Sequence, residues 1–326
     1  MFRNMKSENM LDLVIIGAAA AGSAAAIYAA RRNLNFIVVT KNIGGEVALS
    51  GEVNNWPGII DTTGVALAKN FYEHVKSYDV NIEEGYEVNK ITQEKNYHLV
   101  HAQNTTGEKR LYYTKAVIIA SGIHPRELNT KGEKELRGKG VTYCTVCDGP
   151  LFKNKITATI GAGNSALESA LMMAGIAKKV YLITKYSNDK EHHGGFPRGE
   201  DILIQKTKSL DNVEVIYEAN TTEITGDTMV SGLTYKNVRT DETKTVEVQG
   251  VMVHIGMIPN SSFVSCGKKD QLGQIEVTTK CETDCPGVFA AGDVTNVPFK
   301  QIAIAAGHGV TAALSAIEYI NKWDPK

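Results

Sequence analysis

The stretch LDLVIIGAAAAG, residues 11–22, is an apolar run that ends in small residues. The Ala-rich segment that follows, to about Arg32, is typical of a helix, and Phe36 to Thr40 is typical of a second buried strand. A strand, a small-residue turn, a helix and a second strand open a dinucleotide-binding domain, where the backbone approaches a pyrophosphate at the helix N-terminus. The sequence therefore predicts an α/β fold that begins with a Rossmann-like unit.

The turn in this unit matches the spacing G-x-G-x-x-G at Gly17, Ala19 and Gly22, with Ala in place of the middle Gly. The acid expected to hold a ribose at the end of the second strand is also missing, since Thr40 and Lys41 stand there. A turn that merely packs a helix on a strand would satisfy the same pattern. The motif therefore needs support from elsewhere in the chain.

A second unit of the same kind supplies that support. Ile156 to Ile160 reads as a strand, GAGNSA at 161–166 as the turn, and Val180 to Thr184 as the next strand, with a helix to about Ala174 between them. Here both leading glycines are present. Two such units form an internal repeat, and a chain with two dinucleotide sites usually passes electrons between two dinucleotides.

The two units flank VTYCTVCDGPLF, residues 141–152, in which Cys144 and Cys147 are followed by Asp148. Thiols at C-x-x-C spacing can close a small disulfide ring and cycle between dithiol and disulfide. The alternative is half of a zinc site, which would need a second pair of ligands such as Cys281 and Cys285. The neighbouring Rossmann signatures favour redox chemistry.

Composition narrows the class of protein. The chain has 326 residues, 43% of them hydrophobic, and a net charge of -1 without a block of Lys and Arg, so nucleic acid and membrane are not expected partners. No long apolar signal segment precedes residue 11, and five Cys is an odd and low number, so we expect a cytoplasmic protein. Cys266, Cys281 and Cys285 are interpreted as core or surface thiols, with regulatory pairing a lesser alternative. No metal is expected, because the adjacent His192 and His193 should point apart.

The remaining segments predict the surroundings of a site. Residues 44–58 read as an irregular binding loop, 185–199 as a surface loop and 256–260 as a turn. Residues 288–294 read as a strand that closes on Gly292 and Asp293, before a buried helix over 301–320. Asp293 could accept from a ribityl hydroxyl or lie near phosphates, or it could simply cap that helix.

These motifs together carry a resemblance that covers the chain from about Leu11. CTVCDGPLF, GAGNSALESA, GVFAAGDV and FKQIAIAAGHG, in this order, resemble the low-molecular-weight thioredoxin reductase family of flavoproteins. CDGPLFKNK, KCETDCPGVFAAGDV and VPFKQIAIAAGHG are more similar still to the flavoprotein subunits of alkyl hydroperoxide reductases. Those subunits carry an additional N-terminal thioredoxin-like region, which we do not expect here.

The resemblance implies two Rossmann-like dinucleotide-binding domains, the second inserted in the first. A discontinuous FAD-binding domain would comprise residues 1–122 and 249–326, and a pyridine-nucleotide-type domain with the redox pair would comprise 123–248. Cys144 and Cys147 would be the redox pair, and Asp148 the acid that protonates the departing thiolate or the reduced cofactor. The residues expected to hold FAD are Gly17, Ala19, Ala21, Gly22, Thr40, Gly44, Gly45, Glu46, Asn55, Ala120, Ser121, Gly122, Gly292, Asp293, Lys300, Gln301 and Ile302. Those expected to line the nicotinamide nucleotide site are Gly161, Gly163, Asn164, Ser165 and Ala166.

The implied activity is a FAD-dependent disulfide reductase acting on a thioredoxin- or glutaredoxin-like protein, as a homodimer. NADPH-linked relatives carry a His-Arg-Arg type cluster where this chain reads Thr184, Lys185 and Tyr186, so NADH is favoured over NADPH as donor. A ferredoxin-linked enzyme without a nicotinamide is the alternative. A dithiol oxidase is a further one, although such relatives tend to replace the acid after the second Cys with His.

Overall fold

The computed structural model describes residues 10–324, and the chain folds into two units. Unit 1 comprises residues 1–124 and 258–326, and unit 2 comprises residues 125–257. The second boundary lies after the expected position 248 because strand β17 (Gly250–Val253) pairs with β10 (Val141–Thr142) and β11 (Ile156–Ile160) in the sheet of unit 2. Residues 249–257 therefore belong to the inserted unit, and residues 123 and 124 belong to unit 1.

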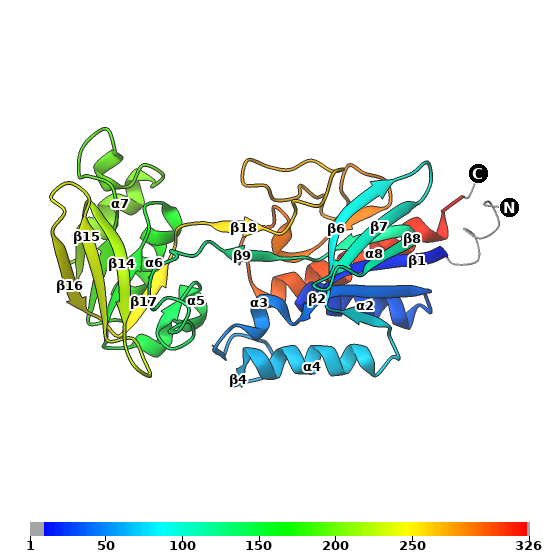
Figure 1. Ribbon diagram of the computed structural model, residues 1–326, viewed down its shortest axis with the longest axis horizontal. Helices are drawn as coiled ribbons and strands as arrows, with labels where there is room; N and C mark the ends of the chain where they lie inside the picture. The colour runs from blue at the N-terminus through cyan, green and yellow to red at the C-terminus, as the bar shows by residue number, and fades with distance from the viewer. Residues whose placement is uncertain (1–9, 325–326) are drawn as a thin grey trace. The chain divides into compact units, whose positions relative to one another are not determined.

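The central sheet of unit 1 has the strand order β5-β2-β1-β8-β7-β6, with β19 paired to β8 (Figure 1). β1 pairs in parallel with β2 and β8, whereas β7 is antiparallel to both β6 and β8. Leu13, Val14 and Ile15 on β1 are wholly buried, as expected for a parallel strand covered on both faces. The strands are β1 (Met10–Ala18), β2 (Phe36–Ile43), β5 (Ile82–Glu84), β6 (Tyr86–Gln93), β7 (His98–Asn104), β8 (Lys109–Ile119) and β19 (Val288–Ala290).

Three helices complete the core of unit 1: α2 (Ala20–Arg31), α4 (Gly64–Lys76) and α8 (Ile302–Asn321). α2 packs against both α8 and α4, and Ala and Gly on the facing surfaces of α2 and α8 allow a close approach (Figure 1). Within residues 10–324, α8 is the one helix whose length and composition would suffice to cross a membrane. Its buried residues, among them Ala305, Gly309 and Ala312, instead make it a core helix.

Two expectations in unit 1 need correction. The segment 44–58, predicted to be an irregular loop, contains the one-turn helix α3 (Gly45–Ala48) and the strand β3 (Glu52–Val53), which pairs with β4 (Thr62–Thr63). The strand predicted over 288–294 ends at Ala290, because Gly292–Val294 turns into a 3-10 helix. Gly292 has φ 74°, a backbone conformation that ends an extended strand.

Unit 2 is built on a parallel sheet with the order β10-β17-β11-β12-β13, joined to an antiparallel sheet β14-β15-β16. The helices α6 (Asn164–Ala174) and α7 (Asp201–Lys208) follow β11 and β12 along the chain, which gives the expected βαβ pattern. The remaining elements are β12 (Lys179–Ile183), β13 (Val213–Ile216), β14 (Ala219–Thr225), β15 (Gly232–Asn237), β16 (Thr243–Glu247), α5 (Thr145–Asp148) and the 3-10 helices η1 (Gly149–Phe152) and η2 (His193–Gly195).

Two further expectations differ from the structure. Phe196 lies within the predicted surface loop 185–199, yet its side chain is wholly buried in the core beneath α6 and α7. The turn predicted at 256–260 contains strand β18 (Met257–Pro259), which pairs with β9 (Ile123–Pro125). Both misses involve short segments whose structure depends on distant residues.

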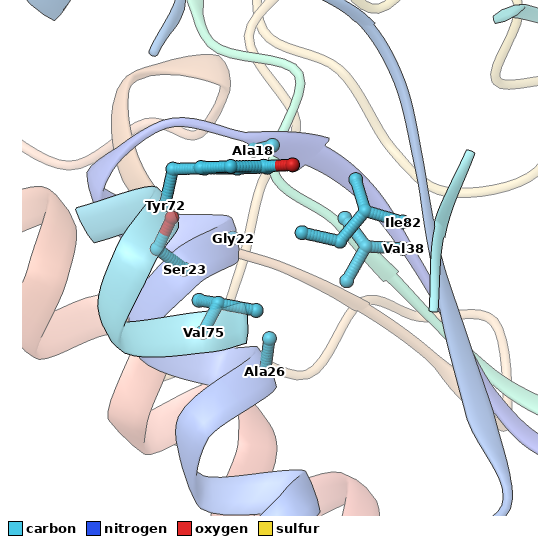
Figure 2. A pocket seen from close by; sticks show the side chains of 8 residues that line it. All are labelled: Ala18, Gly22, Ser23, Ala26, Val38, Tyr72, Val75 and Ile82. Carbon is cyan, nitrogen blue, oxygen red and sulfur yellow. The ribbon is translucent and has the colours of Figure 1, made fainter. Parts of the chain in front are cut away.

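A small gap lies in unit 1 beneath the first glycine turn, between α2, α4 and the sheet (Figure 2). The ring of Tyr72 reaches across it from α4, toward Val38 and Ile82 on the strands. Its other lining residues are Ala18, Gly22, Ser23, Ala26 and Val75. The space leaves no room for a water molecule, so it is a feature of core packing and not a binding cavity.

Candidate functional site

Cys144 and Cys147 form a disulfide in unit 2, with their Cα atoms 5.3 Å apart. Cys144 follows the edge strand β10 and occupies the N-cap position of α5, where its sulfur accepts a hydrogen bond from the backbone N–H of Cys147 at 3.3 Å. The short helix brings the two sulfurs together, as the C-x-x-C spacing predicted. Val146, between the two cysteines, is exposed, so the disulfide lies at the surface of the unit.

Asp148, the predicted acid, is the last residue of α5 and is held by Thr142 on β10. The Thr142 hydroxyl donates to one carboxylate oxygen of Asp148 and accepts from the backbone N–H of Cys144 at 3.1 Å. One buried threonine therefore connects the acid to the first cysteine of the pair. Thr142 gave no signal in the sequence, because its role depends on strand pairing with β17.

A second polar group lies under α5 and was also missed by sequence reasoning. The Thr145 hydroxyl contacts Ser169 Oγ on α6 at 2.6 Å and His254 Nε2, just beyond β17, at 2.8 Å. Burial lowers the pKa of His254 to about 4, so its ring is neutral at physiological pH. The sequence did hold one signal, since His254 directly follows a buried strand at the carboxyl edge of a parallel sheet, where ligands bind.

Glu133 fixes the chain that leads into the redox pair. Its side chain is wholly buried and accepts backbone N–H groups of Leu128 and Asn129 at 2.8 Å each. It also accepts the phenol hydroxyl of Tyr143 at 2.7 Å, and burial raises the pKa of that phenol. Since Tyr143 directly precedes Cys144, this carboxylate anchors the backbone next to the disulfide.

In unit 1, the first glycine turn is shaped for close backbone approach. Gly17 has φ 106°, and a Cβ there would lie 2.3 Å from the carbonyl oxygen of Ala120. A Cβ at Gly22 would lie 1.9 Å from the carbonyl oxygen of Gly17, so both positions exclude any side chain. Ala19 caps α2, and its methyl group lies beside Gly45, which leaves room for it. The departure from Gly at the middle position is therefore accommodated.

Asp293 and Glu46 come together near this turn. Burial raises the pKa of Asp293 to about 6, the Lys300 ammonium opposes this, and the Glu46 carboxylate adds to it. Oδ1 of Asp293 is buried and has no hydrogen-bond partner in the protein. Asp293 is not a helix cap, since Gln301 occupies the N-cap position of α8. A buried acceptor beside a glycine turn fits a ligand that brings hydroxyl donors, as the ribityl chain of FAD does.

Other residues predicted to hold FAD frame this position. Asn55 donates to Gln301 Oε1 at 3.3 Å, which links the segment after α3 to the start of α8 at Ile302. The Lys300 ammonium donates to the carbonyl oxygens of Thr295 and Val297, so it holds its own loop. Gly292 packs against Ala21 and Ala305, since a Cβ there would lie 3.1 Å from the Ala21 methyl group.

The predicted residues at the neighbouring strand ends have diverse surroundings. The buried Thr40 donates its hydroxyl to the carbonyl of Asn42 at 2.6 Å. Gly44 and Gly45 have φ values of 82° and 50°, which aim the chain into α3. Ser121 exchanges two hydrogen bonds with Asn260, and Gly122 accepts the backbone N–H of Asn260. The structure thus brings the predicted FAD residues to the carboxyl edge of the unit 1 sheet and α8.

The second glycine turn, in unit 2, connects β11 to α6. Gly161 has no room for a side chain, because a Cβ would lie 2.3 Å from the carbonyl oxygen of His254. Gly163 caps α6 and Ala166 is buried below it, whereas Ser165 is exposed. Asn164 exchanges hydrogen bonds with Glu200 at 2.8 and 2.9 Å, so its amide fixes α7 to the turn.

The loop after β12 carries the charge that bears on nucleotide choice. Thr184 is buried and donates to the carbonyl of Gly195 at 2.8 Å, while Lys185 lies over the Tyr186 ring. Hydrogen bonds from Ser187 and His192 lower the pKa of the exposed Asp189 to about 2, so this loop holds a carboxylate at neutral pH.

The two adjacent histidines in this loop turn to different partners. His192 contacts Asp189 at 3.0 Å, and His193 contacts Asp201 at 2.7 Å. Across residues 10–324, no group of three or more His, Cys, Asp or Glu side chains is arranged to hold a metal ion.

Residues 11–309 match the pyridine nucleotide-disulphide oxidoreductase family. The chain is 41% identical to the F protein of the alkyl hydroperoxide reductase of Pseudomonas putida, over 97% of this chain and 59% of that protein. It is 37% identical to an NADH dehydrogenase of Bacillus subtilis strain 168, over 95% of this chain and 58% of that protein. The chain thus spans about three fifths of the length of these relatives.

Solved structures show the same fold. Thioredoxin reductase from Streptococcus pyogenes MGAS5005 has a TM-score of 0.88 and 32% identity, with 96% of this chain and 99% of that chain covered. A ferredoxin-flavin thioredoxin reductase from Clostridium acetobutylicum has a TM-score of 0.51 and 30% identity, with 96% and 99% covered. Thioredoxin-reductase-like proteins of this family bind FAD, and the residues of unit 1 fit that cofactor. With its paired glycine turns and its Cys144–Cys147 disulfide, the chain belongs to the pyridine nucleotide-disulphide oxidoreductase family.

Proposed function

We propose that this protein is a FAD-dependent disulfide reductase of the thioredoxin reductase type. The observation that carries the proposal is the surface disulfide Cys144–Cys147 with Asp148 held next to it by Thr142. When bound, FAD supplies the transfer of an electron pair between a donor and this disulfide. The expected physiological state is a cytoplasmic homodimer, with Cys266, Cys281 and Cys285 as free thiols, in keeping with a reducing compartment.

The residues of the chain perform the thiol chemistry. Two electrons break the Cys144–Cys147 bond and leave two sulfur atoms, of which the departing thiolate takes a proton from Asp148. The Thr142 hydroxyl fixes the Asp148 carboxyl and the Cys144 backbone together, so that the proton is delivered from a defined position. One thiolate then attacks a sulfur of the partner disulfide, and the second resolves the mixed disulfide, which restores Cys144–Cys147 and releases a reduced partner.

The partner class follows from the exposure of the pair and from the relatives. Val146 and Leu151 expose apolar surface on either side of Cys147, which suits docking of a protein disulfide. A thioredoxin- or glutaredoxin-like protein is the proposed acceptor, as the structural similarity to thioredoxin reductases supports.

NADH is the proposed donor. The loop after β12 is where Rossmann domains recognise the 2′ position of the adenosine ribose, and here it carries the Asp189 carboxylate, which would repel a 2′-phosphate. The relative described as an NADH dehydrogenase supports the same choice. A ferredoxin-linked reductase is the second candidate, favoured by the similarity to the Clostridium acetobutylicum enzyme.

The test follows the flavin absorbance near ~450 nm in anaerobic stopped-flow runs with NADH, NADPH or reduced ferredoxin, because electron transfer to flavin bleaches that band. We expect fast bleaching by NADH, slow bleaching by NADPH, and a shift toward NADPH in Asp189→Asn. Bleaching by ferredoxin alone would replace the nicotinamide donor by the second candidate. Oxygen consumption driven by a small dithiol, without need of a protein acceptor, would instead identify a dithiol oxidase.

A further inference from the structure

Unit 1 contains a second pair of cysteines in contact, Cys266 and Cys285. Both are free thiols. The Cys285 side chain makes hydrogen-bonding contacts with the Cys266 side chain and with the backbone N–H of Gly267. Cys266 also packs against the hydrophobic cluster of which Cys285 is a member. Two thiols in contact are the minimum requirement for a dithiol that can close to a disulfide.

The fold holds the two segments together around these thiols. The backbone N–H of Lys268 donates to Asp284 Oδ1 at 2.9 Å, one residue before Cys285. A Cβ at Gly267 would lie 3.8 Å from both that oxygen and Thr283 Cβ. The contact between Cys266 and Cys285 is therefore fixed by neighbours on both segments, and does not depend on the two side chains alone.

The two thiols differ in access. Cys266 is partly exposed, whereas Cys285 is only 8% exposed and donates to Gln93 Oε1 at 3.7 Å. Burial raises the pKa of Cys285 to about 12, so this thiol is protonated at neutral pH. An oxidant from solvent therefore meets Cys266 first, with the protonated Cys285 waiting beside it.

We propose that Cys266 and Cys285 form a second redox site, which a peroxide converts to an intramolecular disulfide. In the first step the Cys266 sulfur attacks a peroxide oxygen; the O–O bond breaks, the thiol proton leaves with the departing oxygen, and Cys266 becomes a sulfenic acid. In the second step Cys285 attacks the Cys266 sulfur, the S–O bond breaks, and the Cys285 proton joins the leaving hydroxide as water. Two thiols and one hydrogen peroxide give one disulfide and two waters.

This site is separate from the reductase chemistry, and it stands whether or not the proposed function is right. Cys285 lies in the turn that leads through β19 to Gly292 and Asp293. A disulfide there would tie that turn to the loop at Cys266 and would remove the hydrogen bond from Cys285 to Gln93.

The experiment treats the folded full-length protein with a small excess of hydrogen peroxide, blocks remaining thiols with an alkylating agent after unfolding, and maps tryptic peptides by mass spectrometry. Trypsin places Cys266 on the peptide 245–268 and both Cys281 and Cys285 on the peptide 281–300. The expected product is a cross-link between these peptides, two hydrogen atoms lighter than their sum, which dithiothreitol reverses.

Cys281 provides the matched control, because it is buried like Cys285 but donates to the carbonyl of His308 instead of meeting another thiol. Cys281→Ser should give the same cross-link, whereas Cys285→Ser should lose it and leave a sulfenic acid at Cys266 that dimedone traps. The proposal is overturned if Cys281→Ser gives no cross-link while Cys266 is oxidised, if the bridge joins Cys281 to Cys285, or if the cross-link joins two chains on a non-reducing gel.

Discussion

At the residue scale, the account depends most on Asp148. Replacing Asp148 by Asn keeps the shape of the side chain and the contact with Thr142, but removes the proton. We expect kcat for reduction of a protein disulfide to fall by about 100-fold or more, the usual contribution of general acid catalysis. Steady-state assays on FAD-loaded protein check this.

Thr142→Val is the graded companion of that variant. It leaves the carboxyl in place but removes the hydroxyl that holds Asp148 and Cys144. We expect a smaller fall in kcat than for Asp148→Asn, with unchanged FAD content. Wild-type turnover in Asp148→Asn would remove Asp148 from the mechanism.

His254 gives a prediction for stability against pH. The unfolded chain protonates this histidine near its ordinary pKa of about 6.5, whereas burial holds the pKa in the folded chain at about 4. Between these values the unfolded state binds more protons, so the free energy of unfolding falls as pH falls. From pH 7.5 to pH 5 we expect wild type to lose about 2 kcal/mol more than His254→Asn, by denaturant titration.

The exposed His74 on α4 serves as the control for this measurement. His74→Asn should keep the pH dependence of wild type, because an exposed histidine titrates alike in both states. If His254→Asn follows the wild-type profile as well, His254 is not held neutral by burial.

Residues of the site were predictable where the chemistry is local in sequence. Cys144, Cys147 and Asp148 share one short segment, and their pairing followed from spacing alone. Thr142 and His254 were missed because β10, β17 and α5 meet only in the folded sheet. Non-local hydrogen bonds of this kind leave no pattern in a single sequence.

At the scale of elements, the contact between α2 and α8 carries a sharp prediction. A Cβ at Gly309 would lie 2.0 Å from the carbonyl oxygen of Ala21. Gly309→Ala therefore forces the two helices apart, and we expect a loss of about 1–3 kcal/mol of stability, as overpacking usually costs. Thermal or chemical denaturation measures it.

Gly307 on the same helix offers a matched substitution, since a Cβ there meets nothing within 4 Å. Gly307→Ala should be neutral or stabilise the protein by up to about 1 kcal/mol through helix propensity. Equal effects of the two substitutions would show that the helices do not pack at Gly309 as described.

Long elements with a clear period were predicted well, among them α2, α4, α6 and the parallel strands that flank the glycine turns. The short elements α3 and β18 were missed, because four or fewer residues carry no period of their own. Phe196 was assigned to the surface because its neighbours are polar, and only the packing of α6 and α7 buries it.

At the scale of the whole molecule, the two-unit organisation rests on the repeat of the glycine turn. The repeat predicted the number and type of units, whereas the boundary near residue 248 was placed before β17. That strand pairs with β10 and β11, which no local feature of its sequence shows.

The most direct test of the central claim, that Cys144 and Cys147 accept electrons together with the bound flavin, is an anaerobic dithionite titration of the FAD-loaded protein. Dithionite supplies electrons whatever the physiological donor is. We predict that wild type takes up two electron pairs per chain before the flavin absorbance is fully bleached, and that Cys144→Ser/Cys147→Ser takes up one. Equal uptake of a single pair by both proteins would contradict the account.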